Sequence, residues 1–434
     1  MRKGFKQTEV AIIPDDWDLK PLNVLTNQII DGTHFTPKYI ELGVPFLRVT
    51  DIQDTEIDFN EIKFISPEEH HFLTRRCKPE KGDLLLSKNG TIGIPKIVTW
   101  DWEFSIFVSL ALLKPKTKLI NVQFLEQFFK SEYLVTQIQK RSKQGAVTNL
   151  HLEEIREFLI PIPPILAEQE AIAEALSDAD ALIEAVEQLL AKKHQVKLGA
   201  IQELLTGKRR LAGFEKKSGY KHTEVGIIPE DWDAVSIVEI CDDKKGSIKI
   251  GPFGSQLKRE YLVSSGYKVY GQENVYVQDV EIGDRYLTKE HFLKLKSCEL
   301  LPGDFIVSMM GTIGQCMIVP DGIQQGIIDS HLIRIRLNPK VVVPRYMSYY
   351  YSSKLVFDQI TRLQVGGIMA GLSSSVIKQI YIGLPNTTKE QTAIAEILSD
   401  MDAEITALEE KLVKARQVKA GMMQELLTGK IRLV

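Results

Sequence analysis

Apolar residues recur every three or four positions through two long segments of the chain. In the first segment they are Ile172, Leu176, Ala179, Ile183, Val186 and Leu190, and 222 residues later they are Ile394, Leu398, Met401, Ile405, Leu408 and Leu412. This heptad spacing forms one apolar stripe along a helix and is typical of a coiled-coil seam. Gly207 and Gly429 stand where such helices would end. The pattern predicts two helices of about 40 residues, each about 60 Å long.

Charge along these segments predicts how the helices pair. Between Glu168 and Leu190 there are seven acidic residues and no basic one, whereas residues 191–210 hold six Lys or Arg and one Glu. The second segment repeats this gradient. Antiparallel pairing places each acidic half against a basic half, so we expect it, with the apolar seam supplying the stability. The alternative is two solvated charged faces on helices that pack elsewhere.

The chain is written twice. GFKQTEVAIIPDDWD (4–18) returns as GYKHTEVGIIPEDWD (219–233), and KGDLLLSKNGTIG (81–93) returns as PGDFIVSMMGTIG (302–314). Two halves with the same pattern are expected to fold to the same plan, in a pseudo-twofold arrangement.

Upstream of each long helix, short β-branched and aromatic runs alternate with Gly, Pro, Asp and Asn, which is the pattern of strands and turns. Helical stretches such as 121–141 are mixed in. We therefore expect an α+β protein with two similar mixed α/β globular domains, separated by two long antiparallel coiled-coil helices in an internal pseudo-twofold repeat. The predicted boundaries are 1–164 for the first domain, 165–211 for the first helix, 212–386 for the second domain, and 387–434 for the second helix and tail.

Composition limits the class of protein. The 434 residues are 44% hydrophobic and 26% charged, with no apolar run long enough for a signal peptide or a membrane span. The four cysteines form no C-x-x-C pair, so a reducing cytoplasm is expected. Net charge is -3, so any nucleic-acid binding must use basic residues gathered on particular faces.

Catalytic signatures are missing from the sequence. There is no phosphate-binding G-x-x-x-x-G-K-[ST] loop and no Asn/Asp-Pro-Pro-aromatic tetrapeptide of the kind that amino-methyltransferases use. Asp51 or Asp54 with Glu61 and Lys63 could hold Mg²⁺, but the repeat lacks the lysine, and an exposed strand of alternating charge explains the segment as well. The histidines show no metal-ligand spacing. No catalytic residue, metal or cofactor is therefore predicted.

Both copies of Gly-Thr-Ile-Gly, at 90–93 and 311–314, predict a tight turn between strands. Lys88 and Asn89 precede the first copy, whereas Met309 and Met310 precede the second. The contrast suggests one frame that presents different side chains to two different targets.

Four motifs together carry a family resemblance: TEVGIIPEDW (223–232), DGTHFTPKY (31–39), IPIPPILAEQEAIAEAL (160–176) and QELLTGK (202–208). With them, essentially the whole chain resembles the specificity subunit of type I restriction–modification systems. The resemblance implies that each globular domain is a target recognition domain reading one half of a bipartite double-stranded DNA site, with the helices setting the spacing. It also implies two docked modification subunits, which form an S-adenosylmethionine-dependent methyltransferase, and restriction subunits in the full complex.

Polar and basic side chains of the two domains are the candidates for DNA contact, because Arg and Lys suit guanine edges or phosphates, and Asn and Gln suit adenine. They are Thr33, His34, Lys38, Arg48, Lys88, Asn89, Lys143 and Gln144 in the first domain, and Lys249, Ser255, Gln256, Lys258, Arg259, Gln272, Asn274 and Gln364 in the second. Two other functions stay open: a scaffold that binds only proteins, whose basic residues would not converge, and a Mg²⁺-dependent nuclease at the Asp51 region.

Overall fold

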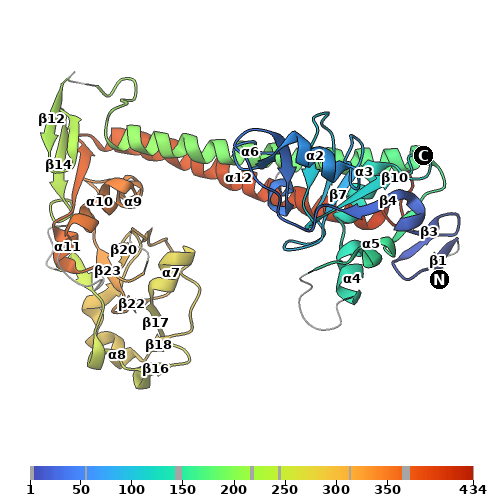
Figure 1. Ribbon diagram of the computed structural model, residues 1–434. Coiled ribbons are helices and arrows are strands. Elements are labelled where there is room, and N and C mark those ends of the chain that lie inside the picture. Colours follow the sequence, from blue (N-terminus) through green and yellow to red (C-terminus); the bar gives the residue numbers. More distant parts are fainter. Residues whose placement is uncertain are drawn as a thin grey trace. The chain divides into compact units, whose positions relative to one another are not determined.

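The computed structural model describes residues 4–53, 56–141, 149–215, 219–242, 246–311, 314–363 and 372–433 (Figure 1). The chain forms two compact units. Unit 1 comprises Met1–Gln188 and Glu409–Val434, and unit 2 comprises Leu189–Leu408. Each unit thus contains part of both long helices. Within the described residues, no helix is both long and apolar enough to cross a membrane.

The two long helices are α6 (Leu166–Leu205) and α12 (Thr388–Leu426), and they lie side by side (Figure 1). Ion pairs between them show their direction: Lys419–Asp180 and Arg416–Glu187 (2.6 Å) in unit 1, and Lys193–Glu404 (2.6 Å) and Lys197–Asp402 in unit 2. In every pair the acidic half of one helix meets the basic half of the other. The predicted antiparallel pairing is confirmed.

A four-stranded antiparallel sheet forms the middle of unit 1, in the order β4 (Thr26–Asp31), β10 (Leu110–Pro115), β7 (Leu84–Ser87) and β8 (Pro95–Ile97). Both of its faces are covered. Leu84 and Leu86 face one core, which includes the start of α6 and the end of α12. Leu85 faces a second core, shared with the three-stranded sheet β6 (Lys63–Ile65), β5 (Val44–Leu47) and β9 (Ser105–Ile106). Burial on both faces explains why LLLS is apolar without alternation.

Short helices and two small ribbons complete unit 1. The helices are α1 (Leu22–Leu25), α2 (Pro67–Thr74), α3 (Val122–Phe129), α4 (Glu132–Arg141) and α5 (Leu152–Arg156). The ribbons pair β1 (Phe5–Gln7) with β2 (Ile12–Pro14), and β3 (Asp18–Pro21) with β11 (Leu159–Ile162). The expected helical stretch 121–141 is two helices, because the chain turns at Ser131, whose hydroxyl donates to the carbonyl of Phe128 at 2.5 Å.

Unit 2 repeats this plan. Its four-stranded sheet has the order β15 (Ile248–Ile250), β23 (Leu332–Ile335), β20 (Phe305–Ser308) and β21 (Cys316–Ile318). The second sheet has the order β16 (Leu262–Val263), β18 (Tyr286–Leu287), β17 (Tyr267–Tyr270), β22 (Gly326–Ile328) and β19 (Glu299–Leu300). Phe305 and Val307 face one core and Ile306 faces the other, as in unit 1.

The remaining elements of unit 2 also have counterparts in unit 1. The ribbons pair β12 (Tyr220–Thr223) with β13 (Gly226–Pro229), and β14 (Trp232–Ser236) with β24 (Tyr381–Pro385). The helices are α7 (Gln272–Val277), α8 (Lys289–Lys294), α9 (Pro344–Tyr351), α10 (Lys354–Leu363) and α11 (Ser374–Lys378). The predicted fold of two similar mixed α/β domains with long helices is confirmed.

An arginine at the end of each long helix ties three segments together. In unit 2, Arg210 pairs with Asp231 (2.7 Å) and Glu390 (2.9 Å), and its guanidinium lies 5.6 Å from the Trp232 ring centre. In unit 1 the same positions are Arg432, Asp16, Glu168 and Trp17. We call each set the arginine clasp of its unit. It links the end of one long helix to the start of the other and to the small ribbon of the IIPxDW motif.

Two neighbouring motif residues complete the clasp. Gly207 has φ of +67° and a Cβ there would lie 2.5 Å from Pro229, so only glycine permits this approach. Gln391, after Glu390, accepts from the backbone of Val343 (2.8 Å) and donates to Pro385 (3.0 Å). Gly429 and Gln169 make the equivalent contacts in unit 1. The clasp accounts for the repeated TGKxRL, EQ and IIPxDW motifs.

Replacing Arg210 with alanine is expected to destabilise unit 2 by about 3–5 kcal/mol, because the buried carboxylates of Asp231 and Glu390 would lose the guanidinium that pairs with both of them. The side chain of Arg210 is 8% exposed, whereas that of the adjacent Arg209 is 75% exposed, so Arg209→Ala is the matched control. Denaturant unfolding of the full chain, followed by circular dichroism, measures the difference. Equal stability of the two variants would contradict this role.

Candidate nucleic-acid interface

Backbone hydrogen bonds join several loops at one end of the four-stranded sheet of unit 1. The loop after β4 begins at Gly32, and the next residue, Thr33, donates to Ile106 (3.1 Å) and accepts from Val108 (2.9 Å). The turn after β7 begins at Lys88, which donates to Ser109 (2.9 Å). We call residues 32–38, 88–93 and 105–109 the loop edge of unit 1. Gly32 is required there, since a Cβ would lie 1.9 Å from the carbonyl oxygen of Ile106.

The same backbone frame occurs in unit 2. A Cβ on Gly251 would lie 1.9 Å from the carbonyl oxygen of Asp329, and Met309 donates to His331 at 2.8 Å. The carbonyls of Lys88 and Met309 accept from Leu150 and Leu372, each at 2.7 Å. We call residues 251–259, 309–311 and 329–331 the loop edge of unit 2. The frame is shared, while the side chains on it differ.

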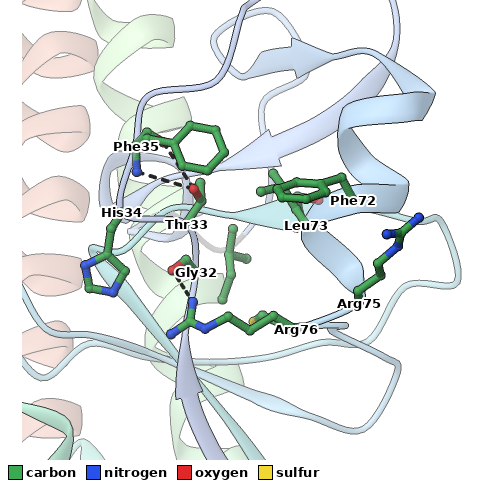
Figure 2. A pocket seen from close by; sticks show the side chains of 11 residues that line it. Gly32, Thr33, His34, Phe35, Phe72, Leu73, Arg75 and Arg76 are labelled. Carbon is green, nitrogen blue, oxygen red and sulfur yellow. Dashed lines mark hydrogen bonds between the residues drawn. The ribbon is translucent and has the colours of Figure 1, made fainter.

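A pocket of about 390 Å³ opens beside the loop edge of unit 1 (Figure 2). It lies between the loop after β4 and the end of α2. The residues that line it are Gly32, Thr33, His34, Phe35, Phe72, Leu73, Arg75, Arg76, Cys77, Ser105 and Ile106. Burial raises the pKa of the Cys77 thiol to about 12, so this side chain is a neutral wall and no nucleophile.

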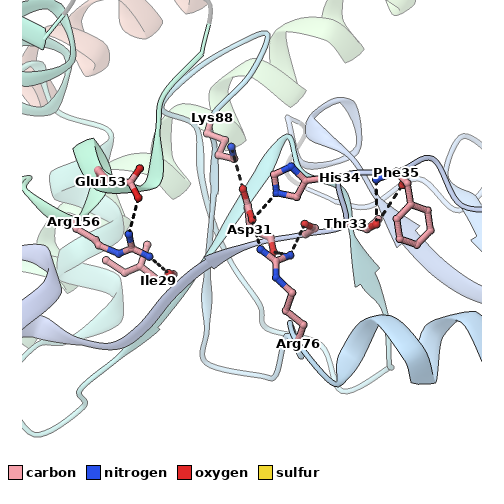
Figure 3. A network of polar contacts seen from close by, with 10 residues as sticks. Ile29, Asp31, Thr33, His34, Phe35, Arg76, Lys88, Glu153 and Arg156 are labelled. Atoms are coloured by element: carbon pink, nitrogen blue, oxygen red, sulfur yellow. Dashed lines mark hydrogen bonds and ion pairs between the residues drawn. The ribbon is translucent and has the colours of Figure 1, made fainter.

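Asp31, at the end of β4, is the centre of a polar network (Figure 3). Its carboxylate is 4% exposed and pairs with Arg76 (2.8 Å), Lys88 (3.2 Å) and His34 (3.2 Å). Burial acts to raise the pKa of Asp31, but hydrogen bonds from these three partners outweigh it and hold the pKa below its usual value. The network therefore fixes the loop after β4, the turn after β7 and the end of α2 relative to one another.

The structure brings most candidates of the first domain together. Four of them lie on the loop edge: Thr33, His34, Lys88 and Asn89. Arg48 lies next to it, because the backbone N–H of the following residue, Val49, donates to the Ser109 hydroxyl at 3.2 Å. Lys38 is exposed farther along the same loop. Lys88 is 5% exposed and holds the scaffold through Asp31, whereas His34 is open to solvent. Lys143 and Gln144 lie outside the described residues.

In the second domain, Ser255, Gln256, Lys258 and Arg259 are exposed on the loop after Gly251. Lys249 is half-buried in β15, opposite Arg334. Gln272 and Asn274 belong to α7, which is joined to the loop edge because the Tyr276 hydroxyl donates to the carbonyl of Met310. Gln364 lies outside the described residues.

Asn274 has a structural task that its residue type did not reveal. It is 1% exposed, and its amide accepts from Gly271 (2.9 Å) and donates to Asp279 (2.9 Å) and Ile282 (3.0 Å). Its counterpart in unit 1 is Asp51, which accepts from the Arg48 backbone at 2.7 Å. Both side chains close a turn at the same point of the frame.

The same contacts weigh against the nuclease alternative. The Asp51 carboxylate is 3% exposed and also accepts from the Arg48 guanidinium (2.8 Å) and the Thr50 hydroxyl (3.0 Å). Its oxygens are therefore occupied within the protein. No group of three or more His, Cys, Asp or Glu suited to a metal occurs among the described residues. Asp54 lies outside them.

Sequence reasoning missed Arg76, Phe72 and Arg75, which complete the pocket and the network. Arg76 also donates to the carbonyls of Asp31 (3.1 Å) and Gly32 (3.0 Å). No local motif links this arginine to a loop more than 40 residues earlier. The one available signal is the pair of adjacent arginines directly after the helix α2.

Comparison with known proteins identifies similar sequences over most of the chain. A family model described as the type I restriction modification DNA specificity domain matches residues 42–192 and 229–415. The putative type I restriction enzyme MjaX specificity subunit of Methanocaldococcus jannaschii is 28% identical over 99% of this chain and 97% of its own length. The EcoBI specificity subunit of Escherichia coli is 28% identical over 45% of this chain and 42% of its own length.

A solved structure has a similar fold. The crystal structure of the type I restriction-modification S subunit from M. genitalium superposes with a TM-score of 0.57, over 98% of this chain and 99% of that one. Only 14% of the aligned residues are identical, so this likeness concerns the fold alone.

Replacing Asp31 with asparagine is expected to destabilise unit 1 by about 1.5–3 kcal/mol at pH 7, because hydrogen bonds to a buried charge are lost. Because the pKa of Asp31 is lower in the folded chain than in the unfolded chain, the ionised carboxylate stabilises the fold at pH values above the unfolded pKa, about 3.9. This stabilisation is lost as pH falls through the folded pKa.

Unfolding free energies measured from pH 7 to pH 2 should therefore show a gap between parent and variant that narrows as pH falls below about 4. Asp101→Asn is the control, because its carboxylate is 80% exposed. A gap that does not change with pH would refute this role for Asp31.

Proposed function

This chain belongs to the type I restriction modification DNA specificity family, and from that premise we propose that it selects the DNA target of a type I complex. Each globular domain reads one half of a bipartite double-stranded site. The domains are residues 1–164 and 212–386, and residues 165–211 and 387–434 carry the helices between them. The chain supplies recognition, and its partner subunits supply the chemistry.

The observation that carries this proposal is the repeated loop edge. Unit 1 and unit 2 hold these loops with equivalent backbone hydrogen bonds, yet Asn89 in one corresponds to Met310 in the other. A fixed frame with exchanged side chains is what two readers of different base sequences need, because base edges are distinguished by side-chain chemistry. Exposed basic residues such as Lys258 and Arg259 suit the phosphates that flank the bases.

The long helices offer places for the modification subunits. Besides the seam, each unit leaves apolar helix residues about half exposed: Leu182, Val413 and Val418 in unit 1, and Leu189, Val196 and Leu198 in unit 2. Val196 and Val418 are equivalent in the repeat. Exposed apolar side chains on the helices of both units support the docking of two modification subunits, one on each. Restriction subunits then join the complex, which we place in the cytoplasm, where thiols such as the four free cysteines stay reduced.

The alternatives fit less well. A protein-only scaffold gives no reason for the convergence of polar loop residues at equivalent edges of both units. A nuclease needs carboxylates that are free to hold metal, and those of Asp51 are already bonded.

Exchange of residues 1–160 for the same region of a relative should change one half-site and leave the other intact, because each loop edge is built within its own unit. Methylated adenines are mapped in DNA from cells that carry the chimaera and the modification partner. The chain without that partner is the control and should give no methylation. A change in both half-sites would overturn the model of independent readers.

Insertion of one heptad after Val186 and another after Leu408 should lengthen the spacer between the half-sites. Seven residues add roughly 10 Å at about 1.5 Å per residue, which is at most about three base pairs at about 3.4 Å each. The seam stays in register because whole heptads are added. Methylation mapping beside the parent measures the spacer. An unchanged spacer in an active assembly would show that the helices do not set the distance.

A further inference from the structure

The pocket of unit 1 in Figure 2 shares Gly32, Thr33 and Ile106 with the loop edge, and the end of α2 forms its other side. Its inner wall is apolar, formed by Leu73, Cys77 and Ile106. Its rim carries the cationic or titratable groups of His34, Arg75 and Arg76. Among the described residues that line it, none is acidic. The lining therefore suits a ligand that joins a flat apolar part to an anion.

Two aromatic rings at the pocket are held open to solvent. Phe35, on the loop after β4, is 50% exposed, and Phe72, on α2, is 58% exposed. Exposure of two aromatic rings to water is unfavourable, and a ligand that covered them would remove this apolar surface from solvent. The loop that carries Phe35 is fixed locally, since the Phe35 backbone N–H donates to the Thr33 hydroxyl at 3.3 Å. Both rings thus offer accessible faces for stacking, and the backbone that carries Phe35 is held in place.

The basic side chains at the rim differ in whether they already have a partner within the protein. Arg76 and His34 are bound to Asp31 in the network of Figure 3. The Arg75 side chain is exposed and makes no hydrogen bond or ion pair within the described part of the chain. Arg75 is therefore free to bind an anion.

We propose that this pocket binds one unstacked nucleotide, with the base against Phe35 and Phe72 and the phosphate at Arg75. Aromatic faces accept any base, and a guanidinium pairs well with phosphate. The inference rests on the proposed function for its setting, because the pocket adjoins the loops that would face DNA. The nucleotide comes either from bound DNA, as an extrahelical residue, or from the free pool.

Unit 2 provides matched control positions. Buried Cys298 corresponds to buried Cys77, and by the same offset Phe72 and Arg75 correspond to Leu293 and Lys296. Leu293 is 54% exposed, so its truncation removes a similar amount of solvent-facing apolar surface without the ring. Changes at these positions alter charge and apolar area equally but spare the pocket.

The test uses the full chain and a fluorescein-labelled single strand of eight thymidylates, with binding followed by fluorescence anisotropy. Phe72→Ala and Arg75→Ala are each expected to weaken binding by about tenfold or more, as loss of base stacking does elsewhere. Leu293→Ala and Lys296→Ala should bind like the parent. Circular dichroism and thermal melting of each variant verify folding. Undiminished binding by both Phe72→Ala and Arg75→Ala would overturn the proposal.

Two further arms identify the source of the nucleotide. If it comes from bound DNA, a duplex with one extrahelical thymidine should bind more tightly than the intact duplex, and Phe72→Ala should abolish that preference. If it comes from the free pool, thymidine monophosphate should displace the labelled strand, and the two duplexes should bind alike. If the parent chain shows neither a preference for the extrahelical duplex nor displacement of the labelled strand by thymidine monophosphate, the proposed nucleotide pocket is also refuted. Methylation mapping tests the proposed function separately, since it requires no extrahelical base.

Discussion

The ion pairs made by the arginine of each clasp are the interaction on which the architecture depends. Arg210 joins the end of α6 to the start of α12 and to the ribbon before Trp232, and Arg432 makes the equivalent links in unit 1. A heptad seam alone tolerates sliding by whole heptads, because its apolar residues repeat. A bidentate ion pair at a helix end does not, since a shift would leave buried carboxylates without their partner. The clasps therefore fix the register of the long helices from both ends.

The four-stranded sheet of each unit, which is covered on both faces, holds the loops in place. Each central strand, such as β7 or β20, packs into two cores, so its ends are held rigidly by apolar contacts on both faces. The loops at one end of this sheet are then joined by backbone hydrogen bonds that do not depend on side-chain identity. Unit 2 keeps these backbone hydrogen bonds with Met309 and Met310 in place of Lys88 and Asn89, so specificity can vary while the fold is preserved.

A net charge of -3 is compatible with nucleic-acid recognition because the charges have separate tasks. Asp180, Glu187, Asp402 and Glu404 of the long helices pair with basic residues of the other helix. Asp16, Asp31, Glu168 and Glu390 are bonded to arginines. Basic side chains on the loops, such as Lys258 and Arg259, stay exposed. Local arrangement, rather than overall composition, decides the electrostatics of the candidate interface.

The sequence by itself determined the repeat, the two long helices and their antiparallel direction, because heptad spacing and charge gradients are periodic local patterns that survive in any fold containing them. It also proposed Thr33, His34, Lys88 and Asn89 as candidates for DNA contact, and the structure gathers these four residues at one edge. Only the tertiary structure decided that Lys88 and Asn274 are buried, that Asp51 is bonded to Arg48, and that Arg75 and Phe72 meet the loop after β4. Those outcomes depend on contacts between segments distant in the chain, such as Arg76 with Asp31, and no local pattern records which distant partner a side chain will meet.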